Sequence, residues 1–136
     1  MKKIMIILLC AGVFIGGWMI YAKGVMPSVE LTVNGFHEHY DKKDFGYIYS
    51  DLVSEEFRAA LPKNIFMDYM NKVYDTVGKI IEVKRGAWGI FYKDVGLTFN
   101  VEYTLKNEKA EMREYFTLVK RGKDWKIFIY DPKVKR

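Results

Sequence analysis

The chain begins with a long apolar stretch that follows two positive charges. Lys2 and Lys3 precede an unbroken run of uncharged, mostly apolar residues from Ile4 to Ala22, and Lys23 ends it. As a helix, these 19 residues would be about 28 Å long at about 1.5 Å per residue, close to the hydrocarbon thickness of a bilayer. The pattern therefore predicts a membrane-targeting segment at residues 1–23.

Two fates of this segment are open. Its length favours an uncleaved signal anchor, as do Trp18 and Tyr21, because aromatic side chains concentrate at the membrane interface. The alternative is a signal peptide cleaved after Ala22, which would release a secreted protein. The basic N-terminus is expected to stay in the cytoplasm. We therefore expect a single-pass protein of the inner or plasma membrane with a C-terminal extracytoplasmic, periplasmic domain.

The pattern of the following residues is helical. Residues 24–28 are expected to form a short connector. A helix is predicted next, because apolar residues recur there every three or four positions: Val29, Val33, Phe36 and Tyr40. A shorter helical piece follows with Asp44 as its N-cap, and another with Ser54 as its N-cap. The clearest helix is predicted over residues 62–77 and ends at Gly78, a residue typical of helix C-termini.

Beyond Gly78 the apolar period changes from helical to two. Four strands are predicted over residues 80–92, 97–105, 112–120 and 125–130, separated by short polar turns. Gly86 and Gly89 interrupt the first strand and indicate a bulge or bend. Helices followed by an antiparallel meander predict one α+β domain at residues 29–136, with helices packed on one face of a curved sheet. We expect the helix over residues 62–77 to cross the concave face.

Composition narrows the possible functions. A hydrophobic content of 50% and an aromatic content of 16% argue against disorder. The net charge is +5, and about +3 without Lys2 and Lys3, so no nucleic-acid partner is expected. Cys10 is the single cysteine, which excludes an intrachain disulfide. The sequence has no phosphate-binding glycine loop and no Cys/His cluster, so we expect no cofactor and no metal.

Element order and aromatic placement resemble the nuclear transport factor 2-like superfamily, a cone-shaped α+β fold, over about residues 29 to 131. The similarity is to small bacterial exported members, many of unknown function, and more distantly to periplasmic domains of membrane-anchored secretion-channel components. It rests on FHEHY at 36–40, DFGYIY at 44–49, VSEEFR at 53–58, VGK at 77–79, EYFTLV at 114–119 and WKI at 125–127. The resemblance implies a cone closed by a strongly curved sheet, and homodimers through the sheet are common in similar proteins.

Enzymes of this superfamily use an acid or base inside the cone together with a tyrosine, which makes four residues candidates for lining a ligand pocket: His37, Asp41, Tyr69 and Glu114. His37 and Asp41 can pair at a spacing of four on one helix. His37 and His39 point in opposite directions and cannot share a metal. Glu114 has apolar residues on its strand face, and cross-strand pairing with Arg113 or Lys126 is expected for it. No residue is assigned as catalytic.

The function expected from these observations is a membrane-tethered extracytoplasmic module that is not an enzyme. It would bind a protein partner or a small ligand, as an envelope or secretion-complex accessory does. Exposed sheet surface that bears Trp88, Phe91 or Tyr92 is expected to serve as the docking or homodimer face. The alternative is a small-molecule enzyme of the isomerase or dehydratase type that uses a carboxylate or histidine in the cone.

Overall fold

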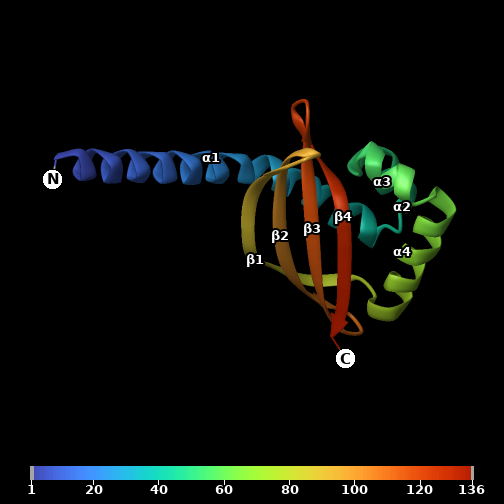
Figure 1. Ribbon diagram of the computed structural model, residues 1–136. Helices are drawn as coiled ribbons and strands as arrows, with labels where there is room; N and C mark the ends of the chain where they lie inside the picture. Colours follow the sequence, from blue (N-terminus) through green and yellow to red (C-terminus); the bar gives the residue numbers. More distant parts are fainter. Residues whose placement is uncertain (1, 136) are drawn as a thin grey trace.

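The computed structural model describes the backbone of residues 2–135, and the side chains of residue 18 and of residues 20–135. A long helix comes first, short helical segments follow, and four strands complete the chain (Figure 1). The helical elements are α1 (Lys2–Asp41), α2 (Phe45–Tyr47), the π-helical turn η1 (Ile48–Leu52), α3 (Glu55–Ala60) and α4 (Lys63–Val77). The strands are β1 (Ile80–Lys93), β2 (Gly96–Asn107), β3 (Glu111–Arg121) and β4 (Asp124–Lys135).

The four strands form one antiparallel sheet in the order β1-β2-β3-β4, so the predicted meander and the α+β class are confirmed. The register of β1 against β2 shifts between Ile80 and Glu82 and again between Arg85 and Trp88. The second shift spans Gly86, one of the two glycines that indicated a bend. Irregularities of this kind increase strand bending, and β1 curves strongly around the end of the sheet (Figure 1).

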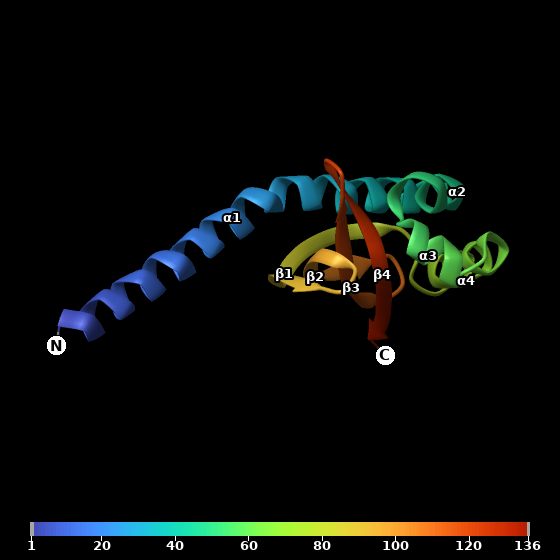
Figure 2. The same ribbon diagram turned by 45° about the horizontal axis from the view of Figure 1, so that its top comes forward.

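The C-terminal half of α1 packs on the sheet, and its four predicted core residues, Val29, Val33, Phe36 and Tyr40, are all buried. The expectation that α4 crosses the concave face is wrong. Helix α4 lies beyond β4 and contacts α2, whereas α1 runs across the strands (Figures 1 and 2). Helix α1 takes this position because its buried apolar stripe is long and extends from Ala22 to Tyr40. At about 1.5 Å per residue, that stripe spans about 27 Å.

Helix α1 has no interruption between its apolar N-terminal part and the domain. The segment 24–28, expected as a connector, is helical, and Val25 and Met26 belong to the hydrophobic core together with Ala22. Pro27 lies inside the helix and supplies no backbone N–H, which is a common cause of helix bending. Figure 2 shows α1 changing direction where it reaches the sheet.

The predicted membrane segment, Ile4–Ala22, falls almost entirely outside the residues whose side chains are described. Within the described part of the chain, no helix carries an apolar stretch long enough to cross a bilayer. The membrane segment and the domain boundaries drawn from it stay predictions.

Two of the predicted helix ends are confirmed and one is not. Ser54 Oγ accepts a hydrogen bond from the backbone N–H of Phe57 at 3.2 Å, as an N-cap does. Gly78 ends α4 with a positive φ of 78°. Asp44 precedes α2 but makes no side-chain cap, because its Oδ2 lies 3.1 Å from Nδ1 of His39 instead.

Candidate functional site

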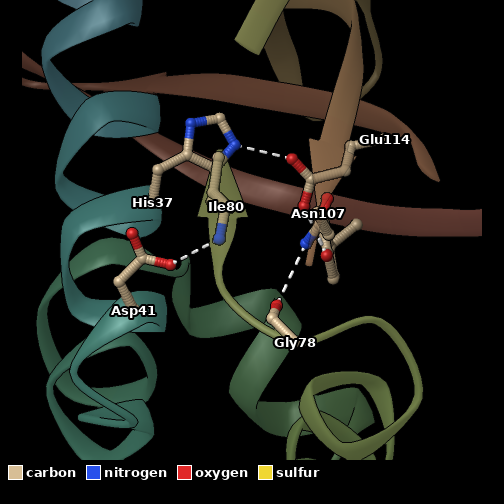
Figure 3. A network of polar contacts seen from close by, with 7 residues as sticks. His37, Asp41, Gly78, Ile80, Asn107 and Glu114 are labelled. Carbon is tan, nitrogen blue, oxygen red and sulfur yellow. Dashed lines mark hydrogen bonds and ion pairs between the residues drawn. The ribbon is translucent and has the colours of Figure 1, made fainter. Parts of the chain in front are cut away.

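Three side chains from three elements meet in one buried polar group. Nε2 of His37, on α1, lies 2.6 Å from Oε1 of Glu114, on β3 (Figure 3). The hydroxyl of Tyr130, on β4, donates to the other oxygen, Oε2, at 2.5 Å. Glu114 pairs with Pro132 across the β3–β4 ladder, so Tyr130 is its diagonal neighbour on the same face. We call His37, Glu114 and Tyr130 the polar triad.

The polar triad is enclosed by aromatic rings. Glu114 is 1% exposed and His37 is 8% exposed. The His37 ring meets Phe36, Tyr103 and Phe116 edge-on, with centroids 5.7 to 6.0 Å apart. A carboxylate is tolerated in such surroundings only when its oxygens have hydrogen-bond partners, and both oxygens of Glu114 do.

The expected partners of Glu114 are not its partners in the structure. Arg113 precedes it on the same strand, so its side chain points to the opposite face and is exposed. Lys126 directs its ammonium group to the backbone carbonyl of Asp51, 2.6 Å away. The prediction of cross-strand pairing with either cation is therefore wrong.

Burial also holds the neighbouring phenols in their neutral form. Burial raises the pKa of the Tyr130 phenol well above its ordinary value, and the adjacent Glu114 carboxylate raises it further. The pKa of Tyr103 rises to about 12, mainly through burial. Tyr130 therefore remains a hydrogen-bond donor to Glu114 over the whole physiological pH range.

Asp41 serves a different purpose from the one expected. Its Oδ1 accepts a hydrogen bond from the backbone N–H of Ile80 at 3.0 Å, which ties the end of α1 to the start of β1 (Figure 3). At the same junction the carbonyl of Gly78 accepts hydrogen bonds from the Tyr40 hydroxyl and from Nδ2 of Asn107. The end of α1 and the first residue of the sheet are therefore fastened by side chains. Asp41 belongs to this junction, whereas His37 pairs with Glu114.

Tyr69 does not join the other candidates. It lies on α4 and is 42% exposed. Partial burial raises its pKa, and the nearby carboxylate of Asp131 adds to the shift. The structure thus brings together His37 and Glu114, leaves Tyr69 at the surface, and adds Tyr130, which the sequence did not single out.

A bulge explains why Tyr130 was missed. The β3–β4 register is regular from the turn up to the pair Leu118–Ile127, and it then shifts by one residue so that Thr117 pairs with Ile129. Counting back from the turn without this shift would place Asp131, rather than Pro132, opposite Glu114. A shift of one residue reverses which side chains face the core. The alternation of β4 alone would therefore place Tyr130 on the face opposite to Glu114.

A second feature is a hollow of about 360 Å³ on the outer face of the sheet, away from α1. It forms where β1 has only small side chains pointing outward, at Ala87 and Gly89. A Cβ atom on Gly89 would lie 2.9 Å from the ring of Phe91, so this ring closely covers the glycine. The remaining outward-facing walls are Asn100, Glu102, Tyr115 and Thr117. We call this feature the outer hollow.

The outer hollow has a polar atom without a partner. Oδ1 of Asn100 is buried and accepts no hydrogen bond from any residue in the described part of the chain. Such an atom is destabilising unless a water or a ligand supplies a donor. The polar triad lines neither this hollow nor the hollow of about 340 Å³ between η1, α3 and Arg121.

The three expected interface residues do not share one surface. Trp88 is half-buried on the helix-covered face, where it stacks on Phe99 with centroids 5.5 Å apart and planes 5° apart. Phe91 points to the outer face and is 48% exposed. Tyr92 alternates back to the side of Trp88 but lies near the end of the strand and is 82% exposed. The alternation of β1 therefore places Phe91 on one face of the sheet and Trp88 and Tyr92 on the other, so an interface on these residues stays a prediction for each face separately.

Comparison with known proteins adds no family assignment. No protein-family model matches the chain, and no curated protein is significantly similar to it in sequence. Among the residues with described side chains, no group of three or more His, Cys, Asp or Glu is placed to hold a metal ion. What stands is an α+β fold, with a helix packed on a curved four-stranded antiparallel sheet, that is compatible with a cone.

Proposed function

We propose that this chain is a nuclear transport factor 2-like domain, tethered to the membrane by its N-terminal apolar segment and held outside the cytoplasm. In this proposal it acts as a binding module for a protein segment, and the outer hollow is the binding site. The likeness to the superfamily rests on the order of helices and strands and on the curvature of β1.

The outer hollow carries the proposal. It offers aromatic walls in Phe91 and Tyr115. Asn100 Oδ1 is buried beside it without a partner among the described residues, and it becomes an acceptor for a ligand when the Asn100 side chain turns toward the hollow. Binding sites commonly combine apolar walls with a few polar groups that fix orientation. The partner that fits is a peptide segment with an apolar or aromatic side chain for the walls and an N–H donor for Asn100.

The polar triad supports a structural role over the enzyme alternative. An isomerase or dehydratase acting through His37 or Glu114 would need its substrate within hydrogen-bond reach of one of them. Both oxygens of Glu114 are already engaged, and aromatic rings stand edge-on against His37. Catalysis through His37 or Glu114 would require these rings to move apart before a substrate could enter.

The location is tested by fusing a topology reporter after Arg136 of the full chain. Alkaline phosphatase at this position is expected to be active in a bacterial host, because it folds only outside the cytoplasm. A cytoplasmic reporter such as β-galactosidase is expected to be inactive at the same position. The reverse pattern would reject the extracytoplasmic location.

Binding is tested by placing a photoreactive amino acid at Thr117, inside the outer hollow, in the full chain in its membrane. The control position is Asp68 on α4. A defined adduct is expected from Thr117 and not from Asp68. Its mass distinguishes a second copy of this chain, which would indicate a homodimer, from a different protein.

A filling variant makes this result specific to the hollow. Ala87→Trp places a large side chain in the space, whereas the matched variant Ala59→Trp lies on the exposed surface of α3. The Thr117 adduct should vanish in Ala87→Trp and persist in Ala59→Trp. An adduct that is equal in both variants would remove the outer hollow as the binding site.

A further inference from the structure

The outer hollow adjoins a second hollow on the same face of the sheet. This second hollow, of about 340 Å³, lies where β2 and β4 end and β3 begins, and its charged walls are Arg113, Lys133, Lys135 and Glu111. Tyr115 lines both hollows, so they meet at its ring. Three cations stand against one carboxylate in the second hollow, and we call it the basic hollow.

Two cations of the basic hollow lie directly opposite each other. Arg113 on β3 pairs with Lys133 on β4 in the register of the sheet. Like charges in this position are destabilising, whereas opposite charges are favourable. The next row toward the β2–β3 turn has the favourable pattern, because Glu111 lies between Lys106 and Lys135. The Arg113–Lys133 pair therefore lowers stability, a local cost of the kind found at functional sites.

Arg113 is the cation that remains available to a ligand. The two lysines each have a carboxylate nearby, because Nζ of Lys133 lies 3.8 Å from Asp131 and Nζ of Lys135 lies 3.6 Å from Glu111. Arg113 is exposed and has no carboxylate at ion-pair distance among the described residues. A guanidinium presents its N–H groups as a planar fork that matches the two oxygens of a carboxylate. A carboxylate is therefore the group that Arg113 would bind best.

The positions of the two hollows on β3 set a spacing for the partner. Thr117 and Tyr115 line the outer hollow, and Arg113 is the next residue on the same face of the strand. At about 3.4 Å per residue, Arg113 lies about 7 Å from Tyr115 and about 14 Å from Thr117 along β3. An extended peptide advances by a similar length per residue, so its groups for the two hollows would be about two to four residues apart.

The carboxylate of Glu102, which lines the outer hollow, is directed away from Arg113. A Cβ atom on Gly86 would lie 3.2 Å from Cγ and Oε1 of Glu102, so the Glu102 side chain lies over Gly86 on β1. Strand β2 separates β1 from β3, and neighbouring strands are about 4.8 Å apart. The Glu102 carboxylate is thus about 10 Å from the β3 row, a distance at which exposed charges are largely screened.

Resting on the proposed role of the outer hollow, we propose that Arg113 and Lys133 form its carboxylate subsite. The partner is an extended peptide segment. It places an apolar or aromatic side chain in the outer hollow and an aspartate or glutamate, about two to four residues away, against Arg113. Lys133, whose Nζ lies 5.8 Å from the centroid of the Tyr115 ring, adds a second positive charge from β4. The bound carboxylate then offsets the repulsion between the two cations.

The test measures the adduct formed by a photoreactive amino acid at Thr117 of the full chain in its membrane. Arg113→Glu reverses the charge, Arg113→Lys keeps it, and Lys72→Glu on α4 is the matched control. The adduct yield is expected to fall at least about fivefold in Arg113→Glu, because a charge-assisted hydrogen bond is lost. The yield should stay within about twofold of the native value in Arg113→Lys and Lys72→Glu.

A loss of folding would not produce this result. A glutamate at position 113 stands opposite Lys133, so the melting temperature of Arg113→Glu should equal or exceed that of the native chain. A lower melting temperature would overturn the inference, because it would mean that Arg113 stabilises the fold. Mass spectrometry of the native adduct should place the crosslink within about four residues of an aspartate or glutamate in the partner segment.

Equal adduct yields in Arg113→Glu and the native chain would overturn the carboxylate subsite and leave the outer hollow as the binding site. A crosslinked segment without a nearby acidic residue would do the same, whether it comes from another protein or from a second copy of this chain. A native chain that forms no adduct at Thr117 would reject the proposed binding site, and this inference with it.

Discussion

His37 and Glu114 are 77 positions apart in sequence, yet Nε2 of one lies 2.6 Å from Oε1 of the other in the core. This contact fastens α1 to the centre of the sheet, and Tyr130 completes it from β4. Both contacts, α1 to β3 and β3 to β4, therefore depend on one carboxylate. A buried group that satisfies two partners at once makes the native arrangement unique but is sensitive to truncation.

Removing the Glu114 carboxylate is expected to be severely destabilising. In Glu114→Ala, His37 and the Tyr130 hydroxyl both lose their partner in a buried site, and the free energy of unfolding should fall by about 3–5 kcal/mol. Urea unfolding of the full chain in mild detergent measures the change. Tyr130→Phe should lose about 1–2 kcal/mol in the native background and almost nothing in the Glu114→Ala background. Equal losses in both backgrounds would contradict the coupling.

Stability should decline in alkaline solution because of the buried phenols. The pKa of Tyr103 is raised from 10.0 to about 12 in the folded protein. Between these two pH values the unfolded chain has released the proton and the folded chain has kept it, so stability falls as pH rises. Below pH 10 this contribution is fully present. Tyr103→Phe should therefore flatten the decline above about pH 10, as thermal melts across the alkaline range would show.

Tyrosinate absorbance gives an independent check on the same groups. The phenols of Tyr103 and Tyr130 should titrate above the ordinary tyrosine pKa of 10.0, because burial raises the pKa of both. A titration in which all tyrosines ionise together while the protein is still folded would contradict the burial of the polar triad.

The N-cap of α3 can be tested against a matched control. Ser54→Ala removes the acceptor for the Phe57 N–H and is expected to lower the free energy of unfolding by about 1 kcal/mol. Asp44 precedes α2 at the equivalent position but makes no cap hydrogen bond. Asp44→Ala should therefore change the free energy of unfolding by no more than about 0.5 kcal/mol. Chemical denaturation compares the two variants, and a larger loss in Asp44→Ala would contradict the assignment.

A side chain at Gly78 is expected to lower the stability of the folded protein. Its φ of 78° disfavours any L-residue, and a Cβ atom there would approach the Cβ of Glu108 to 3.1 Å. Gly78→Ala should therefore lose about 1–2 kcal/mol of stability. Gly46→Ala is the control, because a Cβ at Gly46 meets nothing within 4 Å and its change should be neutral or slightly stabilising. Thermal melts of both variants decide the comparison.

Local patterns in the sequence predicted the elements well. The apolar spacing from Val29 to Tyr40 is helical and its residues are buried, and the period of two beyond Gly78 marks four strands in the expected order. Ser54 and Gly78 act as the expected helix boundaries. These features follow from contacts between near neighbours, which the order of residues specifies directly.

Long-range packing decided the rest. Periodicity shows that a helix has an apolar face, but it does not show what that face packs against. The pattern therefore predicts α4 on the concave face of the sheet, where the structure has α1. One extra residue in β4 turns Tyr130 toward Glu114. The alternation of apolar and polar residues along β4 does not reveal this shift. The sequence by itself determined the helices, the strands and their order, because each is stabilised by residues close in the chain. The tertiary structure alone decided which side chains share the core, because a buried polar group takes whichever partner the packed elements bring within reach.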